Sequence, residues 1–380
     1  MKKVAVVYQV LAHYREPIFH RLCHESDDIE YTFFSDESNT FNSVEVIDPA
    51  KASLPIEKGG LRWHFVKNFY CRNFLWQTSI VKLAFSKEFD CIIYLGDAQY
   101  ISTWFSCSLA RLMGKRTLMW SHGFLRNENG IKGLIRKTFY KLANAMLLYG
   151  NRARKIMIDK GFSPDNLYVV YNSLDYDKQI QARDAIDEQQ VKDLRGKIFA
   201  NPELPALFFI GRLIKSKKLN MILQAMHLLA KKRINANLLF IGDGSETDNL
   251  RSLAKELDLQ DKVVFYGKCH NEQELAPLIM ACDICISPGN IGLTAMHSLI
   301  YGKSVITSDK FDIQGPEFEA IEPDKTGDFF AGDNIEDLAV KIEKWIKKGN
   351  NKELCYKIID DYYNPCYQVK VINEAVMGQK

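Results

Sequence analysis

Two cations follow a strand-like run in the second half of the chain. The run ALFFI leads into Gly211, and Arg212 and Lys217 follow in the segment GRLIKSKK. A glycine permits a tight exit from a strand, and two cations at the end of a strand suit the oxygens of a diphosphate. The alternative is a solvated basic turn, and this segment alone does not favour either interpretation.

A glycine-containing turn follows a second strand-like run. In SPGNIGLTAMHSL, Gly289 and Gly292 flank the turn, and Thr294 is placed to cap a helix that runs to Tyr301. Unpaired N–H groups at the start of such a helix attract anions. Because strand-to-helix turns with glycine are common, the motif is a weak signal by itself.

A histidine follows a strand-like run in the first half. His122 stands beside Gly123 in WSHGF, directly after RTLM, and therefore at a strand end rather than on a helix face. Histidine ionises near neutral pH and both donates and accepts protons. A packed or solvent-facing histidine is the alternative, since only a residue that faces a cleft between two domains would touch a substrate.

Acidic residues in other loops have less specific interpretations. GDGSET at 242–247 imitates the start of a dinucleotide-binding motif, but Asp243 would face a pyrophosphate and the third glycine is missing, which excludes a nicotinamide cofactor. Turn chemistry explains the D-x-D pattern of Asp175 and Asp177 better than a metal site does. Glu317 lies near the glycine turn if the strands are ordered as expected; its alternative is an ordinary solvated acid. We predict no metal and no cofactor.

Strands and crossover helices must position these loops. Short β-rich runs alternate with helix-period segments in both halves: VAVVYQV, DCIIYLG, RTLMWSHG, AMLLYG and LYVVYN, then ALFFIGR, NLLFIGDG, KVVFYG, DICISPG and SVITSD. The alternation predicts an α/β fold with two doubly wound, Rossmann-like domains. The polar stretch 176–205 has no β run and is predicted to be an interdomain linker between domains at 1–175 and 206–363.

Composition bounds the classes of function. The 380 residues are 47% hydrophobic and carry a net charge of +3, a balance that excludes disorder and gives no global signature of a nucleic-acid partner. Nine cysteines, an odd number, indicate a reduced cytoplasmic chain, and Cys282 and Cys285 are expected to be buried strand residues. The longest uncharged stretch, 284–302, contains a proline and three glycines and would make a poor membrane span.

One segment departs from this charge balance. Residues 131–160 hold eight Lys and Arg against one acid. Five residues can share one helix face, and three others lie on another: Ile131, Leu134, Ile135, Thr138 and Leu142, against Lys132, Arg136 and Tyr140. A basic amphipathic helix can lie on anionic lipid. The alternative is a helix docked on the sheet with a solvated basic face, and the two are compatible.

Taken together, the loops resemble the retaining glycosyltransferases of GT-B fold, specifically the large bacterial family four that builds surface polysaccharides and glycolipids. The resemblance covers nearly the whole chain, through AHYREPIFHRL, WSHGF, YNSLD, FIGRLIKSKK, FIGDG, VVFYGKC and NIGLTAMHSLIYGKSVIT in family order. It implies two domains facing across a cleft, and a C-terminal segment at about 364–380 that crosses back to the first domain.

The function and its residues are implied by this resemblance. A nucleotide-diphosphate sugar would donate its sugar, with retention and without a metal, to a glycan or lipid-linked acceptor at the inner membrane face. Arg212 and Lys217 would bind the diphosphate, and His122 would lie near the transferred sugar. Other donor contacts would come from Gly211, Gly267, Lys268, Asn290, Gly292, Leu293 and Thr294. Tyr14 and Arg15 would lie on the acceptor side.

The chain departs from the family at two positions. Members usually carry two glutamates around the glycine turn, where this sequence has Gly289 and His297. A ring nitrogen of His297 can replace the second carboxylate as a partner of the ribose hydroxyls, and Glu317 is a candidate to replace the first. Two alternatives remain: a nucleotide-sugar epimerase of the same architecture, and a donor-binding subunit that has lost catalysis.

Overall fold

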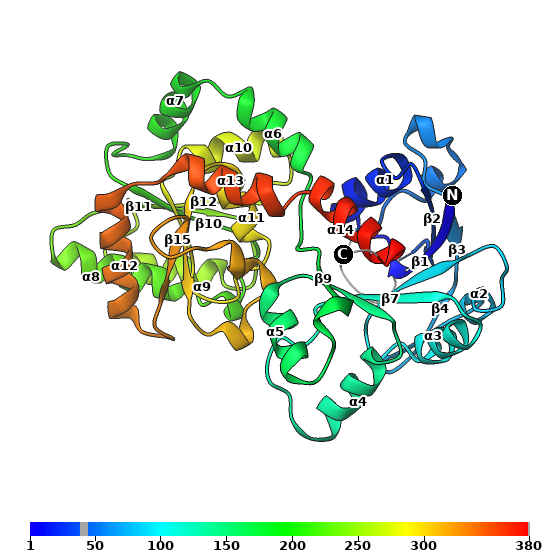
Figure 1. Cartoon of the computed structure of the whole chain (residues 1–380). Helices are drawn as coiled ribbons and strands as arrows, with labels where there is room; N and C mark the ends of the chain where they lie inside the picture. Colours follow the sequence, from blue (N-terminus) through cyan, green and yellow to red (C-terminus); the bar gives the residue numbers. More distant parts are fainter. Residues whose placement is uncertain (39–44, 379–380) are drawn as a thin grey trace. The chain divides into compact units, whose positions relative to one another are not determined.

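Two parallel sheets organise the chain (Figure 1). The computed structural model describes residues 1–38 and 45–378. The chain divides into two units, one of Met1–Asp175 with Asn364–Lys380 and one of Tyr176–Tyr363. Each unit has its own hydrophobic core, which is the α/β organisation that the alternating runs predict.

The first unit contains a seven-stranded sheet in the order β3-β2-β1-β6-β7-β8-β9, with every pair parallel. Its strands are β1 Lys2–Val10, β2 Ile29–Asp36, β3 Trp63–Phe65, β6 Cys91–Leu95, β7 Arg116–Ser121, β8 Ala145–Leu148 and β9 Leu167–Val169. Its helices are α1 Glu16–His24, α2 Ile80–Leu83, α3 Ile101–Leu112, α4 Gly130–Tyr140, α5 Asn151–Asp159 and α14 Pro365–Met377. A hairpin of β4 Asn68–Cys71 and β5 Phe74–Gln77 was not predicted from the sequence.

Strand β1 shows why these runs are apolar on both faces. Val4 and Val6 lie in one hydrophobic cluster, while Ala5 and Val7 lie in another. Because side chains alternate across a strand, the two clusters cover opposite faces of the sheet. A parallel sheet buried on both faces has this continuous apolar pattern.

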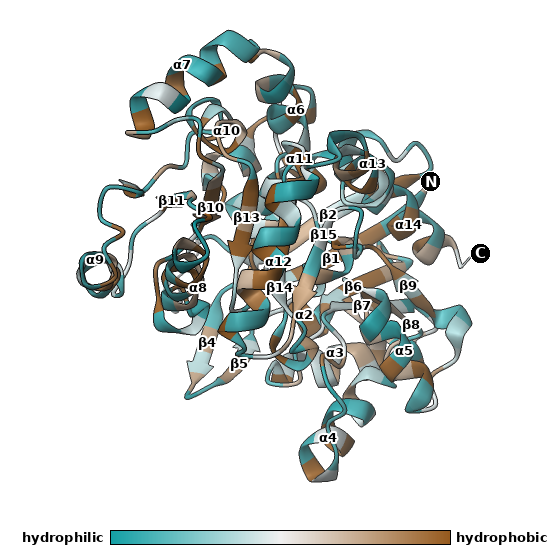
Figure 2. Ribbon diagram, turned by 90° about the vertical axis from the view of Figure 1, so that its left-hand side faces the viewer, coloured by the Kyte–Doolittle hydropathy of each residue, from teal (hydrophilic) through white to brown (hydrophobic). Residues whose placement is uncertain are grey.

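The second unit contains a six-stranded parallel sheet in the order β12-β11-β10-β13-β14-β15. Its strands are β10 Ala206–Ile210, β11 Asn237–Ile241, β12 Val263–Gly267, β13 Ile284–Ser287, β14 Ser304–Ser308 and β15 Gly327–Phe330. Its helices are α6 Tyr176–Asp184, α7 Glu188–Ile198, α8 Asn220–Lys231, α9 Thr247–Glu256, α10 Glu272–Met280, α11 Thr294–Ile300, α12 Ile335–Lys348 and α13 Lys352–Tyr362. Figure 2 shows β10 and β13 in brown, as expected for strands buried on both faces.

Both sheets reverse their strand order beside a central strand. In the first unit the reversal lies between β1 and β6, and in the second it lies between β10 and β13. Ligands of open α/β sheets bind beyond the carboxyl ends of the strands at such a reversal. The two loops that leave β10 and β13 carry Arg212 and the glycine turn, so the fold brings these motifs to one edge.

Residues 176–205 do not form a linker. They contain α6 and α7, which both pack against α10 inside the second unit. Gln179 is buried and donates to Glu272, and Arg195 forms a two-pronged ion pair with Asp283. The prediction of a linker is wrong because polar contacts hold these helices, and such contacts leave little apolar pattern in the sequence.

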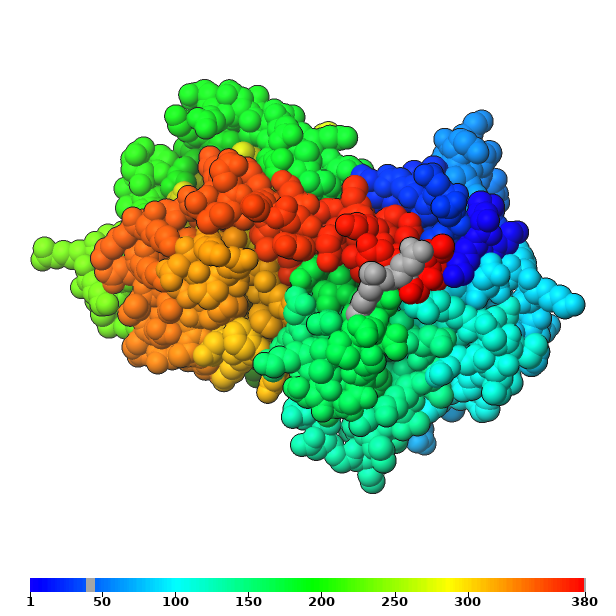
Figure 3. Space-filling view, viewed as in Figure 1, coloured from blue at the N-terminus to red at the C-terminus, as the bar shows by residue number. Residues whose placement is uncertain are grey.

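The C-terminal helix α14 belongs to the first unit. It packs along α1, and the red C-terminal segment lies beside the blue N-terminal one in Figure 3. Gln368 accepts from Ser173 at 2.6 Å, and the hydroxyl of Tyr31 donates to Asn373 at 2.6 Å. Hydrogen bonds therefore join the two separate parts of this unit.

The basic segment 131–160 differs from its predicted arrangement. On α4, Ile131, Leu134 and Ile135 are 79%, 64% and 48% exposed, so these apolar side chains are not docked on the sheet. Tyr140, expected on the polar face, is buried and bonds to Ser121. No helix in the described part of the chain is long and apolar enough to cross a membrane. All nine cysteines are free, and Cys282 and Cys285 are buried as predicted.

Candidate functional site

The cations of the second unit lie just beyond the end of β10. Gly211 has φ of +138°, a conformation that favours glycine. Arg212 is exposed and has no hydrogen-bond or ion-pair partner among the described residues. Lys217 donates from Nζ to the carbonyl of Asn290 at 2.5 Å. Burial lowers the pKa of Lys217, and the positive charge of Arg212 lowers it further.

Gly289 is packed against the loop that carries Lys217. Its N–H donates to the Lys217 carbonyl at 3.1 Å. A Cβ at this position would lie 2.3 Å from the carbonyl oxygen of Ser216 and 2.8 Å from Cα of Lys217. The position of the family's first glutamate therefore has no room for any side chain in this chain. The same contact joins the glycine turn to the basic loop.

Gln314, which the sequence analysis did not single out, fixes the turn from the other side. Its side chain is buried, accepts from the N–H of Ile291 at 2.9 Å and donates to the carbonyl of Gly289 at 3.2 Å. The same amide nitrogen also donates to the hydroxyl of Thr307 and to the carbonyl of Ser308, both on β14. One amide thus ties the turn to β14. Nothing in the local sequence marks this glutamine as different from a surface residue.

Glu317 lies beside the glycine turn. It is only 4% exposed, which makes the alternative of an ordinary solvated acid wrong. A Cβ built on Gly315 would lie 2.5 Å from the Glu317 carboxylate and 3.6 Å from both Asn290 Oδ1 and Gly292 Cα. The Glu317 charge also acts on Lys217, whose pKa it tends to raise. A carboxylate therefore lies close to the turn, contributed by a neighbouring loop.

Thr294 does not cap its helix as the sequence predicts. Leu293 is the residue before α11, and no side chain caps it. The Thr294 hydroxyl instead donates to the carbonyl of Ile210 at 2.8 Å. This bond fastens the start of α11 to the end of β10, which holds the glycine turn beside the basic loop.

His297 has a partner that the sequence analysis missed. Its Nε2 lies 3.6 Å from Oε2 of Glu272, the first residue of α10. Tyr301 and Gln179 also donate to this carboxylate. Burial tends to raise the pKa of Glu272, but the bonds from these side chains, His297 foremost, lower it on balance.

The remaining predicted residues lie in loops at the ends of β11 and β12. Gly267 ends β12 with φ of +95° and accepts from the N–H of Gly242 at 2.8 Å. Lys268 follows it and acts electrostatically on Asp243. Asp243 itself accepts from Thr247. Among residues 1–38 and 45–378, no group of three His, Cys, Asp or Glu side chains is arranged to hold a metal ion.

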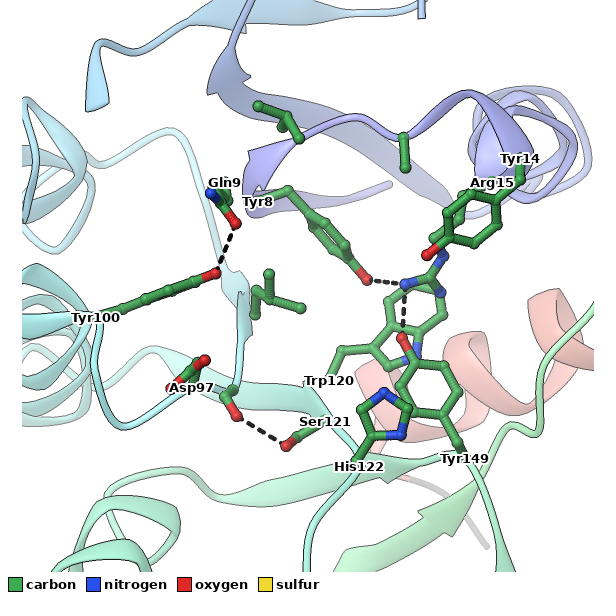
Figure 4. Close-up of a pocket in the computed structure, with 14 residues that line it drawn as sticks. Tyr8, Gln9, Tyr14, Arg15, Asp97, Tyr100, Trp120, Ser121, His122 and Tyr149 are labelled. Carbon is green, nitrogen blue, oxygen red and sulfur yellow. Dashed lines mark hydrogen bonds between the residues drawn. The ribbon is translucent and has the colours of Figure 1, made fainter. Parts of the chain in front are cut away.

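The first unit has a pocket of about 290 Å³ at its own strand reversal (Figure 4). Its walls come from the carboxyl ends of β1, β6 and β7 and from the segment before α1. The lining residues are Tyr8, Gln9, Val10, Ala12, Tyr14, Arg15, Leu95, Gly96, Asp97, Tyr100, Trp120, Ser121, His122 and Tyr149. The pocket brings together all three candidates that the sequence placed in the first unit: Tyr14, Arg15 and His122.

Arg15 is the buried cation of this pocket. It is 6% exposed and donates from Nη1 to the hydroxyls of Tyr8 at 2.7 Å and Tyr149 at 2.6 Å. Its guanidinium carbon lies 4.2 Å from the ring centre of Trp120. Burial raises the pKa of both tyrosines, so their hydroxyls stay protonated and uncharged.

His122 lies against the same wall. Its ring centre is 4.6 Å from that of Tyr149. Part of the ring is exposed, yet the surrounding wall desolvates it and, together with the charge of Arg15, lowers the pKa of His122 to about 4. The imidazole is therefore neutral near pH 7. It has one nitrogen to donate a hydrogen bond and one to accept.

Sequence reasoning missed the aromatic walls. Tyr8 lies in the run VAVVYQV two residues before its end, and Tyr149 directly follows the strand residues AMLL. Only Tyr149 therefore carries the strand-end signal that led to His122. Trp120 opens the same WSHGF motif, two residues before the histidine. Aromatic residues in such runs resemble core residues, and only the fold distinguishes those that face a pocket.

The part of the chain that contains the cation pair matches a known family. Residues 190–361 match the model of the glycosyl transferases group 1. A lipopolysaccharide 1,6-galactosyltransferase of Escherichia coli K12 is 22% identical over 247 residues, 63% of this chain and 64% of that protein. An alpha-monoglucosyldiacylglycerol synthase of Streptococcus pneumoniae is 30% identical over 127 residues, 33% of this chain and 29% of that protein.

The match to an uncharacterized glycosyltransferase of Haemophilus influenzae has 24% identity and spans 42% of this chain and 44% of that protein. The chain thus spans less than half the length of the first curated relatives that it matches.

Solved structures resemble the chain over nearly its whole length. Anabaena Alr3699/HepE in complex with UDP has a TM-score of 0.72 at 15% identity, covering 99% of this chain and 100% of that one. The apo lipopolysaccharide outer core galactosyltransferase WaaB has a TM-score of 0.68 at 16% identity, covering 99% of each chain. The chain therefore has the GT-B fold of two Rossmann-like units, and its residues 190–361 match the model of the glycosyl transferases group 1.

Proposed function

We propose that this protein is a glycosyltransferase that moves a sugar from a nucleotide-diphosphate sugar to a glycan or lipid-linked acceptor. One observation carries the proposal. Arg212, unpaired among the described residues, and Lys217 lie beyond β10 at the strand reversal of the domain that matches the family model. Such a pair of cations suits a diphosphate leaving group.

The proposed chemistry is electrostatic. Cleavage of the bond between sugar and phosphate builds negative charge on the departing diphosphate. A fixed donor at a developing oxyanion contributes about 2.7–4 kcal/mol to lowering the barrier. Lys217 is held by Asn290 and by the packing of its loop on Gly289, so its position is largely set before the substrate binds. The two cations can serve this role without a metal ion.

We infer a uridine nucleotide as the donor and retention of the anomeric configuration. Two related solved chains are described as complexes of HepE with UDP and with UDP-glucose. Retention follows from the resemblance to family four, in which the leaving phosphate assists attack on the same face of the sugar. Gly267 and Lys268 would contact the base, and Gly292, Leu293 and Thr294 the phosphates and sugar. His297 and Glu317 would replace the family's glutamates.

The acceptor is assigned to the pocket of the first unit, with His122 near the transferred sugar and Tyr14 and Arg15 on the acceptor side. The relatives named for lipopolysaccharide and diacylglycerol substrates support a glycan or lipid-linked acceptor. We propose that the enzyme works in the cytoplasm at the inner membrane face, where the exposed apolar residues of α4 and its lysines contact anionic lipid.

Two alternatives have specific support. A putative UDP-N-acetylglucosamine 2-epimerase from Listeria monocytogenes shares the fold, with a TM-score of 0.61 at 12% identity, covering 99% of this chain and 96% of that one. A donor-binding subunit without catalysis is favoured by Gly289, which leaves no room for the family's first glutamate.

Proton NMR of UDP-sugars with the purified chain separates these functions. A retaining transferase should slowly hydrolyse its donor without acceptor, releasing UDP and, from an α-linked donor, first the α-anomer of the sugar. An epimerase would release a different hexose derivative. Binding of UDP without any turnover, even when glycolipid vesicles are added, would identify a subunit that lacks activity.

A further inference from the structure

The pocket of the first unit contains a positive charge that no acid compensates. Arg15 makes hydrogen bonds through Nη1 only to two neutral phenols. Nη2 is buried and has no hydrogen-bond partner. No ion pair joins Arg15 to a carboxylate in the part of the chain that the structure describes. An unpaired buried charge is expensive, and folded proteins usually pair it or bind it to a ligand of opposite charge.

Aromatic rings offset part of this cost. The guanidinium lies over Trp120 and within 6 Å of the rings of Tyr8, Phe19 and Tyr149. Cation–π contacts of this kind are favourable, and they are stronger when the cation is desolvated. These contacts provide no acceptor for the N–H groups of Nη2. Those groups can donate to a planar anion with two oxygens.

The opposite wall of the pocket has a different character. Figure 4 shows Asp97 on the far side of the pocket from Arg15. Asp97 is exposed, and the one described hydrogen bond of its carboxylate comes from the N–H of Gln99 at 2.9 Å. A carboxylate can accept from sugar hydroxyls but repels an anion, so the pocket has one end for negative charge and another for hydroxyl groups.

Tyr14 lies next to the cation in the same pocket. Its ring stands beside the Arg15 guanidinium in Figure 4. The side chain is 43% exposed and makes no hydrogen bond among the described residues. A side chain held so weakly can change its rotamer at little cost and open a path to Nη2.

We propose that this pocket binds an acceptor sugar through a negatively charged substituent, a carboxylate or a phosphate monoester, which pairs with Arg15. The inference rests on the proposed function, because it takes the first unit to be the acceptor side. It narrows that function to the class of acidic acceptors, with Asp97 selecting hydroxyl groups at the other end of the same sugar.

Ligand-observed NMR tests the proposal with three probes: methyl β-glucuronide, glucose 6-phosphate and the neutral methyl β-glucoside. We expect saturation transfer to one or both acidic probes and none to the neutral sugar at the same concentration. The arm that responds shows whether the substituent is a carboxylate or a phosphate. Equal signals from acidic and neutral probes, or no signal from either acid, would overturn the proposal.

Variants then locate the binding. Arg15→Gln should reduce affinity for the acidic probe at least tenfold, whereas Arg72→Gln, at an exposed turn of the same unit, should not change it. UDP affinity, measured on the same samples, should be unaltered by Arg15→Gln and shows that the second unit is folded. A cooperative melting curve and a far-UV circular dichroism spectrum like those of the wild type show that the first unit is folded as well. Undiminished acid binding by Arg15→Gln would contradict the proposal. If the wild type does not bind UDP at all, that result would instead contradict the proposed function.

Discussion

At the scale of single residues, Gly289 separates this chain from the family pattern it resembles. The sequence shows that a glutamate is missing, but it cannot show that the space is taken by the backbone of Ser216 and Lys217. The close approach of two loops depends on a residue without Cβ. The departure is therefore a feature of the packing, and Glu317 reaches the turn from another loop.

Gly289→Ala should destabilise the protein. The new Cβ would meet backbone atoms at 2.3 Å, and such overpacking costs about 1–3 kcal/mol of unfolding free energy. Urea denaturation measures this loss. Gly196→Ala is the matched control: no atom lies within 4 Å of its added Cβ, and in the helix α7 alanine should stabilise by about 0.5–1 kcal/mol. Equal stability of Gly289→Ala and wild type would refute the contact.

The pocket of the first unit gives a second prediction at this scale. Arg15→Gln removes one of the two causes that lower the pKa of His122, so that pKa should rise above about 4 while staying below 6.5 because the wall remains. Histidine NMR titration, with His122→Gln to assign the signal, measures the change. If the pKa of His122 is the same in Arg15→Gln as in the wild type, Arg15 does not act on this ring.

The lowered pKa of His122 also determines how the free energy of unfolding changes with pH. Since the folded pKa of His122 is below its unfolded value, the unfolded chain binds more protons between about pH 4 and pH 6.5. His122 therefore contributes stability above this window, which is lost as the pH falls through it.

At the scale of elements, ten of the thirteen strands described in the two parallel sheets were predicted from the sequence, whereas β2, β3, β15 and the polar helices were not. Ten β-rich runs stand out because both faces of each sheet are covered. The predicted linker is instead α6 and α7, and the sequence does not show this because α7 buries no residue and is bound through Arg195 to Asp283. The hairpin of β4 and β5 was missed because its strands expose Phe69, Phe74 and Trp76.

The contact between α10 and α11 changes what is expected of His297. His297→Ala should weaken UDP binding, because it removes a hydrogen-bonding ring from the helix that follows the glycine turn. His297→Glu alone should not restore UDP affinity, because the new carboxylate would lie beside the carboxylate of Glu272. The double variant His297→Glu with Glu272→Gln should restore it. Calorimetric titration with UDP compares the three variants. Wild-type affinity in His297→Ala would make the histidine a packing residue.

At the scale of the whole molecule, the order of strands explains which motifs meet. The basic loop and the glycine turn are 72 residues apart from Lys217 to Gly289, yet they touch because β10 and β13 are neighbours. The positions of these two motifs directly after strands were enough to predict that they lie at the same edge of the sheet. The bonds of Gln314 depend on a loop conformation, and the contact of His297 with Glu272 depends on how α10 lies beside α11. No pattern in the sequence specifies either.

The exposed face of α4 predicts peripheral binding to anionic membranes. Each cation near such a surface contributes about 1 kcal/mol, screened over about 8 Å at physiological salt. The wild type should float with liposomes as their anionic-lipid content rises. Changing Lys132, Lys137 and Lys141 to Glu should abolish this, and Leu134→Gln with Ile135→Gln should weaken it. Leu112→Gln, an exposed leucine on α3, is the control. If binding to liposomes does not change with their anionic-lipid content, α4 is a solvated helix and does not contact the membrane.

The central claim is that the Arg212 and Lys217 pair binds a nucleoside diphosphate without a metal, and titration calorimetry with UDP in EDTA tests it most directly. The wild type should bind. A charge-assisted hydrogen bond contributes about 1.5–3 kcal/mol, so Arg212→Ala and Lys217→Ala should each weaken binding by roughly ten- to a hundredfold. Lys255→Ala, at an exposed position on α9, should bind as the wild type does. No binding without manganese, or equal affinity in all four proteins, would contradict the account.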